Sequence, residues 1–200
     1  YTVVLSGTGG EYALTVTGSA APADLGTLTF SDGVAWKNGN PATGIVVVPN
    51  GVGSFKVTLP TVDDATIETT ETAVLTVGGV AATGTIADND SQAVTAVTAE
   101  DAAHTGMVPA DDSVVEGGAL LYTVTLNGAS PVSTEYAVAL SGTAGGADLA
   151  ALAFSNGVAW KNGDANTGIV VVPAGVTSFR ATLTTADDTA IESTETAVLT

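Results

Sequence analysis

The 200-residue sequence predicts an all-β protein built from tandem immunoglobulin-like antiparallel β-sandwiches. Three observations predict this fold: segments in which apolar and polar residues alternate, turn dipeptides between them, and a long internal repeat. Alternation with a period of two indicates strands with one buried face. Asn-Gly and Asp-Gly dipeptides suit tight hairpins because these residues tolerate a positive φ. Strands at short intervals joined by such turns are typical of two packed antiparallel sheets.

The strand pattern is clearest in three segments, where apolar residues alternate mainly with threonine. The expected inward-facing residues are Tyr122, Val124, Leu126, Phe179, Ala181, Leu183, Ala73, Leu75 and Val77. The expected turn dipeptides are Asp32-Gly33, Asn38-Gly39, Asn50-Gly51, Asn127-Gly128 and Asn162-Gly163. A capped helical turn and a strand fit residues 98–101 equally well.

The internal repeat covers most of the chain. Residues 11–76 align without a gap onto residues 135–200, an offset of 124, and about two thirds of the positions are identical. Upstream the offset falls to 121, since Tyr1 matches Tyr122, so the second copy has the longer loop. Copies this similar predict tandem modules of ordinary domain size. We place them at residues 1–90 and 91–200, with the N-terminal strand of the first and the C-terminal strand of the second outside the sequence.

The composition excludes several classes of protein. With 21 acidic and 4 basic residues the net charge is −17, which disfavours binding to nucleic acid or to an anionic membrane. The absence of cysteine excludes disulfide scaffolds and thiol chemistry. Apolar runs such as Ile45–Val48 are too short to span a bilayer, so we expect no membrane insertion. A hydrophobic fraction of 45% argues against disorder.

The acidic residues recur in clusters. The motif Asp-Asp-x-x-x-Glu-x-x-Glu spans residues 63–71 and again 187–195, and an Ala-Asp-Leu turn also occurs in both copies. An Asp-Asn-Asp triplet closes the first module at residues 88–90. Carboxylates about 4 Å apart repel by roughly 1 kcal/mol in water and about 4 kcal/mol at an effective dielectric constant near 20. A divalent cation relieves this repulsion, and oxygen ligands without His or Cys favour calcium.

The order of these motifs resembles the Calx-beta domain. The matching features are Glu-Gly at residues 116–117, Gly-Thr-Ala with Ala-Asp at residues 142–148, the paired acidic motif, and Ile-x-Asp-Asn-Asp at residues 86–90. The phrases at residues 172–179 and 72–80 resemble extender repeats of giant repeats-in-toxin-type bacterial adhesins. The resemblance implies a calcium-binding sandwich of an extracellular, cell-surface protein, with the site at the end of the domain where the chain leaves for its neighbour.

The resemblance also implies a set of calcium ligands. For the first module they are Asp24, Asp63, Asp64, Glu68, Glu71, Asp88 and Asp90. For the second module they are Glu116, Asp148, Asp187, Asp188, Glu192 and Glu195. No nucleophile elbow, phosphate-binding glycine loop or dinucleotide fingerprint appears in the sequence, so we expect no enzymatic activity.

These observations predict a calcium-stiffened spacer of a long bacterial adhesin or surface fibre, whose partners are neighbouring repeats and, through other parts of the protein, a host or matrix surface. One alternative is a self-assembling filament joined by strand donation between modules. Another is a carbohydrate- or protein-binding module that uses Trp36 and Trp160, although either residue can instead cover an edge of its own sandwich. We expect the four cations, Lys37, Lys56, Lys161 and Arg180, to pair with carboxylates of an adjacent module or chain.

Overall fold

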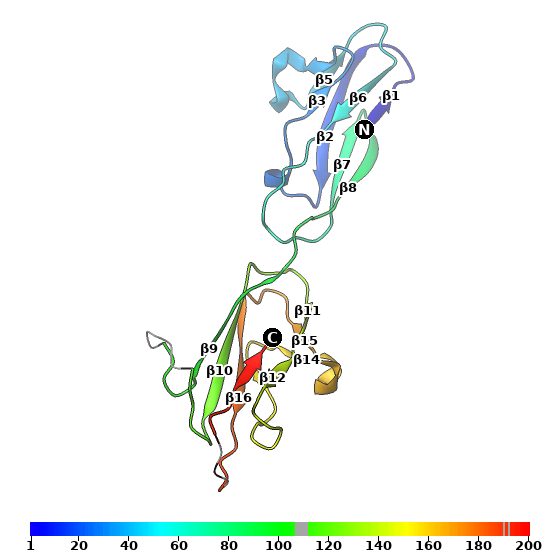
Figure 1. Ribbon diagram of the computed structural model, residues 1–200. Helices are drawn as coiled ribbons and strands as arrows, with labels where there is room; N and C mark the ends of the chain where they lie inside the picture. The colour runs from blue at the N-terminus through cyan, green and yellow to red at the C-terminus, as the bar shows by residue number, and fades with distance from the viewer. Residues whose placement is uncertain (107–111, 190, 192) are drawn as a thin grey trace. The chain divides into compact units, whose positions relative to one another are not determined.

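The structure is a computed structural model that describes residues 1–106, 112–189, 191 and 193–200 (Figure 1). The described residues are all-β: they form seventeen strands in antiparallel sheets and five short 3₁₀ turns, without an α-helix. The chain divides into two compact units, residues 1–65 with 69–89 and residues 66–68 with 90–200. Within the described part, no helix is long and apolar enough to cross a membrane.

The first unit contains two antiparallel sheets. The smaller has the order β1 (Thr2–Val4), β6 (Ser54–Thr58), β3 (Thr29–Phe30). The larger has the order β4 (Ala35–Trp36), β5 (Ile45–Val48), β2 (Gly10–Gly18), β7 (Glu71–Val77), β8 (Val80–Ile86). One buried cluster draws Phe55 and Val57 from the smaller sheet and Leu14, Val46 and Leu75 from the larger. The two sheets therefore share one apolar core.

The second unit repeats this arrangement, but one of its sheets has an additional strand and the other is divided into two. One sheet has the order β13 (Ala153–Phe154), β16 (Ser178–Thr184), β10 (Ala119–Leu126), β9 (Val94–Asp101). The counterpart of the five-stranded sheet consists of β11 (Thr134–Ala137), β15 (Ile169–Val172) and β14 (Ala159–Trp160), and separately of β12 (Leu140–Gly142) with β17 (Ala197–Leu199). Residues 98–101 lie in strand β9, which decides between the two alternatives that the sequence left open.

The alternating patterns predict the buried faces correctly. All nine residues expected to face inward are buried, and in β16 the burial alternates along the strand. Three of the five turn dipeptides have both residues at positive φ, as predicted: Asp32-Gly33, Asn38-Gly39 and Asn162-Gly163. At Asn50-Gly51 only the glycine does.

The prediction of a positive-φ turn at Asn127-Gly128 is wrong, because Asn127 is tied to the start of the second unit. Its backbone N–H donates to the Ala93 carbonyl (3.0 Å), and its side-chain oxygen accepts from the Ala93 N–H (2.9 Å). Its side-chain amide donates to the Ser91 carbonyl (3.0 Å). These contacts connect positions more than thirty residues apart, which local turn chemistry cannot anticipate.

The internal repeat of the sequence is also a repeat of side-chain contacts. The Tyr1 hydroxyl donates to the Ala73 carbonyl (2.7 Å), and the Tyr122 hydroxyl donates to the equivalent Ala197 carbonyl (2.8 Å). Burial raises the pKa of Tyr122 above its ordinary value.

The two tryptophans pack against the cores of their own units. Trp36 meets Phe30 edge to face with ring centroids 5.2 Å apart, and Trp160 meets Phe154 in the same way at 5.1 Å. Both tryptophans are half-buried. These contacts are those of an aromatic side chain that covers its own core.

Two of the four cations form ion pairs inside their own unit. The Lys37 ammonium donates to Glu11 (2.7 Å), and the Lys161 ammonium donates to Glu135 (2.7 Å). For these two lysines, the expectation of pairing with an adjacent module or chain is therefore wrong. Strand pairing explains the contact, because β4 and β2 both pair with β5, and β14 and β11 both pair with β15.

The Lys161–Glu135 pair is expected to contribute little to stability. The Lys161→Met variant should lose at most about 1 kcal/mol of unfolding free energy, since both side chains are well exposed to solvent. Urea denaturation at low and high salt measures this, and the difference from the unsubstituted chain should shrink at high salt. A loss that persists at high salt would contradict a weak, solvent-screened pair.

Candidate metal centre

Asp24 is held in place by the backbone around it. It ends the 3₁₀ turn η1 (Pro22–Asp24) and is only 8% exposed. The Ala21 N–H donates to its carboxylate (2.8 Å), and its own carbonyl accepts from the Val62 N–H (2.8 Å). A bridge between Leu25 and Thr61 fixes the same loop. The carboxylate is therefore oriented before any ligand arrives.

A close backbone crossing brings the Asp24 segment to the start of β7. Gly18 has φ +133°, and a Cβ built on it would lie 2.1 Å from the Thr72 carbonyl oxygen. That oxygen accepts from the N–H groups of Ser19 and Ala20, both at 3.1 Å. The equivalent Gly142 has φ +135° and would place a Cβ 2.0 Å from the Thr196 oxygen. Only glycine fits these crossings. Gly142 is part of the family motif at residues 142–148, but the sequence does not predict the close approach at either glycine.

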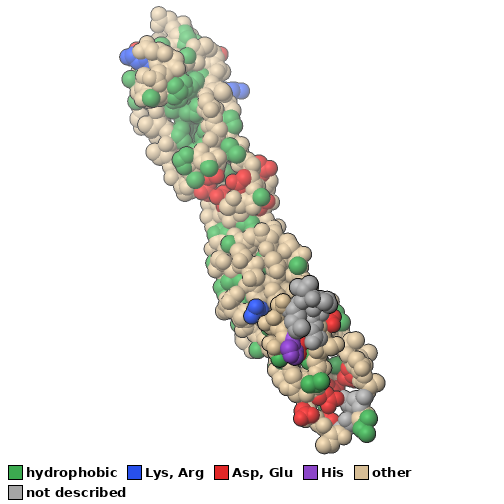
Figure 2. All heavy atoms as spheres, turned by 90° about the vertical axis from the view of Figure 1, so that its left-hand side faces the viewer, with side chains coloured by type: hydrophobic (Ala, Val, Ile, Leu, Met, Phe, Trp, Pro, Cys, Tyr) green, Lys and Arg blue, Asp and Glu red, His purple; other side chains and the backbone are tan. Residues whose placement is uncertain are grey.

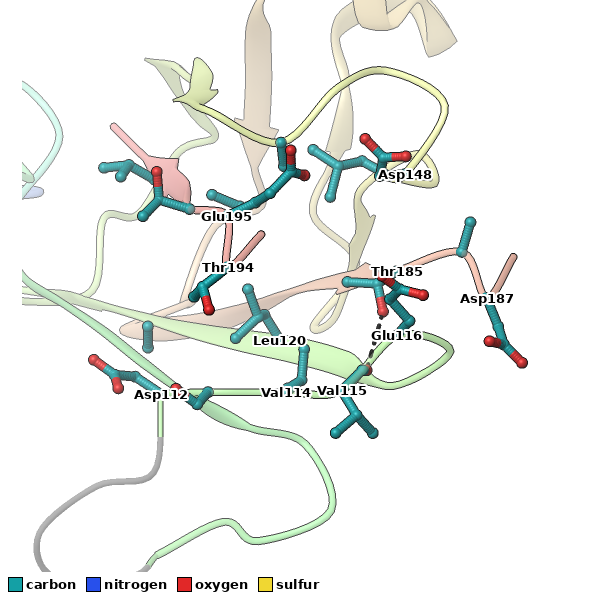
Figure 3. A pocket seen from close by; sticks show the side chains of 18 of the residues that line it. Asp112, Val114, Val115, Glu116, Leu120, Asp148, Thr185, Asp187, Thr194 and Glu195 are labelled. Atoms are coloured by element: carbon teal, nitrogen blue, oxygen red, sulfur yellow. Dashed lines mark hydrogen bonds between the residues drawn. The ribbon is translucent and has the colours of Figure 1, made fainter. Parts of the chain in front are cut away.

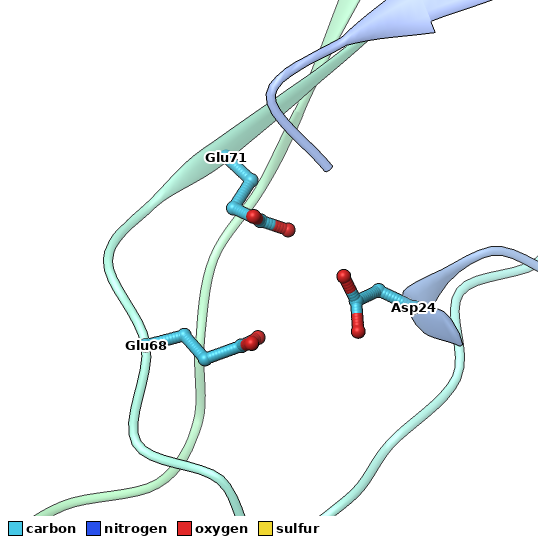
Figure 4. Close-up of side chains that lie close together, drawn as sticks. All are labelled: Asp24, Glu68 and Glu71. Carbon is cyan, nitrogen blue, oxygen red and sulfur yellow. The ribbon is translucent and has the colours of Figure 1, made fainter. Parts of the chain in front are cut away.

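Three carboxylates meet next to this crossing (Figure 4). Asp24 comes from η1, Glu68 from the loop between β6 and β7, and Glu71 is the first residue of β7. One carboxylate oxygen of each lies within 4.8 Å of the others, and Figure 4 shows the side chains pointing toward one another. Asp24 is buried and the two glutamates are half-buried. On the face shown in Figure 2, the acidic side chains of the first unit gather mainly at one end.

The geometry of this cluster fits a calcium ion. Calcium binds oxygen ligands at 2.3–2.6 Å, so two oxygens on one ion are at most about 5 Å apart. The separation of 4.8 Å or less among these oxygens satisfies that condition. Burial and then the charge of Asp24, together with a hydrogen bond to it, raise the pKa of Glu71 above its ordinary value. The three acids thus bring negative charges close together, and a cation bound among them would offset this charge.

The other predicted ligands of the first module are not members of this group. Asp63 and Asp64 are exposed in the loop that leads to Glu68. Asp88 and Asp90 are half-buried and follow β8, whose last residue, Ile86, pairs with Glu71. The closing triplet therefore leaves the sheet beside the strand position of Glu71.

In the second unit, the predicted ligands border an open hollow of about 860 Å³ (Figure 3). Asp148 lies in the turn that is equivalent to the turn of Asp24 in the first unit. Its carboxylate accepts a hydrogen bond from the Gly145 N–H (2.8 Å), and its carbonyl accepts one from the Ala186 N–H (2.8 Å). It is half-buried, whereas the other acids of the hollow are exposed. Those acids are Asp112, Glu116, Asp187, Asp188 and Glu195. Glu192, the counterpart of Glu68, lies outside the described residues.

The acids around the hollow are spread over several segments, as Figure 3 shows for Asp112, Glu116, Asp148, Asp187 and Glu195. Strand pairing accounts for the different exposure of Glu71 and Glu195. Glu71 belongs to β7, which pairs with β2 on one side and β8 on the other. Glu195 lies two residues before β17, and among the described residues β17 pairs with β12 alone. Asp112 borders the hollow although the sequence motifs did not point to it.

Gln92 anchors the chain just after the closing triplet. Its side-chain NH₂ donates to the carbonyls of Gly128 (2.7 Å) and Val176 (2.8 Å). Its side-chain oxygen accepts from the hydroxyls of Thr134 (2.5 Å) and Tyr136 (3.2 Å). The start of the second unit is thereby held by a side-chain amide that donates two hydrogen bonds and accepts two. No motif in the sequence had marked Gln92 as structurally important.

Comparisons with models of known protein families, with curated proteins and with solved structures find no match to this chain. The resemblance to Calx-beta domains and to adhesin extender repeats therefore stays a prediction based on short motifs.

Proposed function

We propose that this chain is a non-enzymatic structural repeat, a calcium-stiffened spacer of a long extracellular bacterial adhesin or surface fibre. The observation that carries the proposal is the group of three carboxylates formed by Asp24, Glu68 and Glu71. Asp24, Glu68 and Glu71 face one another at a spacing that suits calcium, and Asp24 is buried and oriented by a backbone hydrogen bond.

The fold that we propose for each module is an immunoglobulin-like sandwich of the Calx-beta type. The shared core between two antiparallel sheets supports it in the first unit. The equivalent tyrosine, tryptophan and aspartate contacts support the same fold in the second. A tandem of such modules suits a role as a spacer, since each repeat needs only its neighbours.

Calcium would stiffen the chain where it leaves the first module. The ion would join η1, the β6–β7 loop and the start of β7, which pairs with the end of β8. Asp88 and Asp90 come shortly after β8, and the family resemblance implies that they are further ligands in the connection. On the other side of the connection, Gln92 holds the chain to the second unit. Millimolar calcium outside a cell keeps sites of moderate affinity filled.

Calorimetric titration of the full chain tests the proposal. Calcium is expected to bind saturably and more tightly than magnesium, because irregular carboxylate sites suit calcium better than the octahedral preference of magnesium. The double variant Glu68→Gln/Glu71→Gln should remove at least one bound ion. Glu11→Gln, which removes a charge elsewhere in the same unit, should leave the stoichiometry unchanged. Absence of binding at millimolar calcium would refute the proposal.

A further inference from the structure

A pair of side-chain hydroxyls joins the end of β2 to the start of β7. Ser19 is the first residue after β2, where the chain turns toward η1. The Thr72 N–H donates to the Ser19 hydroxyl oxygen (2.9 Å), and the two hydroxyl oxygens lie 3.3 Å apart. The Ser19 N–H donates to both the hydroxyl oxygen and the carbonyl oxygen of Thr72, at 3.3 and 3.1 Å. Ser19 and Thr72 thus form a reciprocal set of hydrogen bonds, which we call the hydroxyl clamp.

The Ser19 hydroxyl takes a place that a backbone carbonyl has in a regular sheet. In an antiparallel ladder, the N–H of a strand residue donates to a carbonyl of the neighbouring strand. The ladder between β2 and β7 ends with Gly18 opposite Ala73, and the next N–H, that of Thr72, donates to the Ser19 side chain. The clamp therefore continues the connection between the two segments beyond the point where backbone pairing stops.

The clamp connects the segments that carry two of the three carboxylates of the candidate metal centre. Glu71 directly precedes Thr72 in β7, and Asp24 ends the short turn that follows Ser19. The oxygens of these two acids belong to the group that lies within 4.8 Å. If the clamp opens, the segments of Asp24 and Glu71 can move apart.

The second unit contains the same clamp with a different residue in it. Thr143 stands where the first unit has Ser19, and Thr196 corresponds to Thr72. The Thr196 N–H donates to the Thr143 hydroxyl oxygen (2.9 Å), and the two hydroxyl oxygens are again 3.3 Å apart. The Thr143 N–H donates to the hydroxyl and carbonyl oxygens of Thr196 at 3.2 and 3.0 Å. The hydroxyl is thus kept although the residue type changes.

The residues between the clamp and the aspartate differ more between the two units. Ala21 and Pro22 of the first unit correspond to Gly145 and Gly146 of the second. The turn nevertheless keeps its backbone hydrogen bond to the aspartate carboxylate, at 2.8 Å in both units. In the second unit the clamp is present although the acids are spread over several segments (Figure 3). The clamp therefore does not depend on gathered carboxylates.

We infer that Ser19 and Thr72 are positioning residues of the metal centre, a role that rests on the proposed function. Their hydroxyls hold the segments of Asp24 and Glu71 together before the ion arrives, and they do not bind the ion themselves. When only a fraction of the molecules has the binding-competent arrangement, the apparent dissociation constant rises in inverse proportion to that fraction. The clamp keeps this fraction high with uncharged groups, which add nothing to the repulsion among the acids.

Removal of the Ser19 hydroxyl should weaken calcium binding at this centre without abolishing it. In calorimetric titration of the full chain, the binding event of the centre is the one lost in Glu68→Gln/Glu71→Gln. In Ser19→Ala, the loss of one hydrogen bond should raise the calcium dissociation constant of that event by about fivefold, at unchanged stoichiometry. Faster hydrogen exchange of the Thr72 N–H in a chelator would show that the bond to Ser19 has been lost.

Two matched variants distinguish positioning from a general loss of stability. Ser19→Thr restores the hydroxyl in the form that the second unit uses, and its calcium affinity should lie within about twofold of the unsubstituted chain. Thr15→Ala removes a hydroxyl from β2 that forms no hydrogen bond within the described part of the chain. It should also leave the calcium affinity within about twofold.

The outcomes separate the positioning role from the proposed function. If the unsubstituted chain binds calcium at the centre and Ser19→Ala binds it equally tightly, the positioning role is wrong and the metal centre stands. An affinity of Ser19→Thr as low as that of Ser19→Ala would also overturn the role, because the hydroxyl would not be the group that matters. Absence of calcium binding to the unsubstituted chain would refute the proposed function, and the positioning role with it.

Discussion

Replacing Asp24 with asparagine is expected to stabilise the calcium-free chain and to destabilise the calcium-saturated chain. Without calcium, the substitution removes one of three carboxylates that lie within 4.8 Å of one another, a gain of about 1 kcal/mol. The asparagine side-chain oxygen can still accept from the Ala21 N–H, so the loop keeps its hydrogen bond. With calcium about a thousandfold above its dissociation constant, binding contributes roughly 4 kcal/mol, and most of this should be lost.

Thermal and urea unfolding, each measured in calcium and in a chelator, show whether the change in unfolding free energy caused by Asp24→Asn has opposite signs in the two conditions. The control is Asp32→Asn, which removes one charge outside the cluster; the second copy already has asparagine there, Asn156, with the same φ of 57°. The control should shift stability equally in both conditions. If Asp24→Asn shifts the unfolding free energy in the same direction in calcium and in chelator, the cluster of Asp24, Glu68 and Glu71 does not bind calcium.

Replacing Gly18 with alanine is expected to destabilise the first unit by about 3 kcal/mol. The new Cβ would lie 2.1 Å from the Thr72 carbonyl oxygen, and rotation of a side chain cannot relieve an overlap between a Cβ and the backbone. The φ of +133° adds strain for any residue with a Cβ. Separation of the strands at this crossing would also move Asp24 away from Glu71, so calcium affinity should fall together with stability.

Tryptophan fluorescence can follow the first unit alone in a Trp160→Phe background, because the chain then keeps only Trp36. Gly7→Ala is the control, since a Cβ at Gly7 would meet no atom within 4 Å and its φ is not positive. It should change the unfolding free energy by less than about 0.5 kcal/mol. A similarly small effect of Gly18→Ala would mean that the crossing is not as tight as the structure describes.

The sequence predicted the buried faces of the strands because their signal is local. An alternation such as Tyr122, Val124 and Leu126 needs only neighbouring residues to be recognised, and these residues are buried as expected. Turn chemistry was equally informative where the turn was self-contained, as at Asn38-Gly39. It failed at Asn127, whose backbone and side chain are committed to a segment more than thirty residues away.

The candidate site was only partly predictable for the same reason. The repeat and the family resemblance pointed to Asp24, Glu68 and Glu71, but also to four further acids that do not belong to the group of three. Membership in that group depends on the crossing at Gly18 and on the pairing of β7 with both neighbours. These are tertiary features, and neither glycine content nor charge spacing reveals them.

The connection between the units begins with acidic residues after β8 and ends at the neutral side chain of Gln92, so its two ends differ in chemical character. The Gln92 amide is neutral, and every donor and acceptor of the group is satisfied by protein atoms. This end is therefore indifferent to acidity and to the supply of ions. The end that follows β8, in contrast, consists of carboxylates and would respond to both. In a chain of such repeats, one end of each connection would stay attached under all conditions, and the other end would be fixed only when a cation is bound. The stiffness of the chain would then depend on the ions in the surrounding solution.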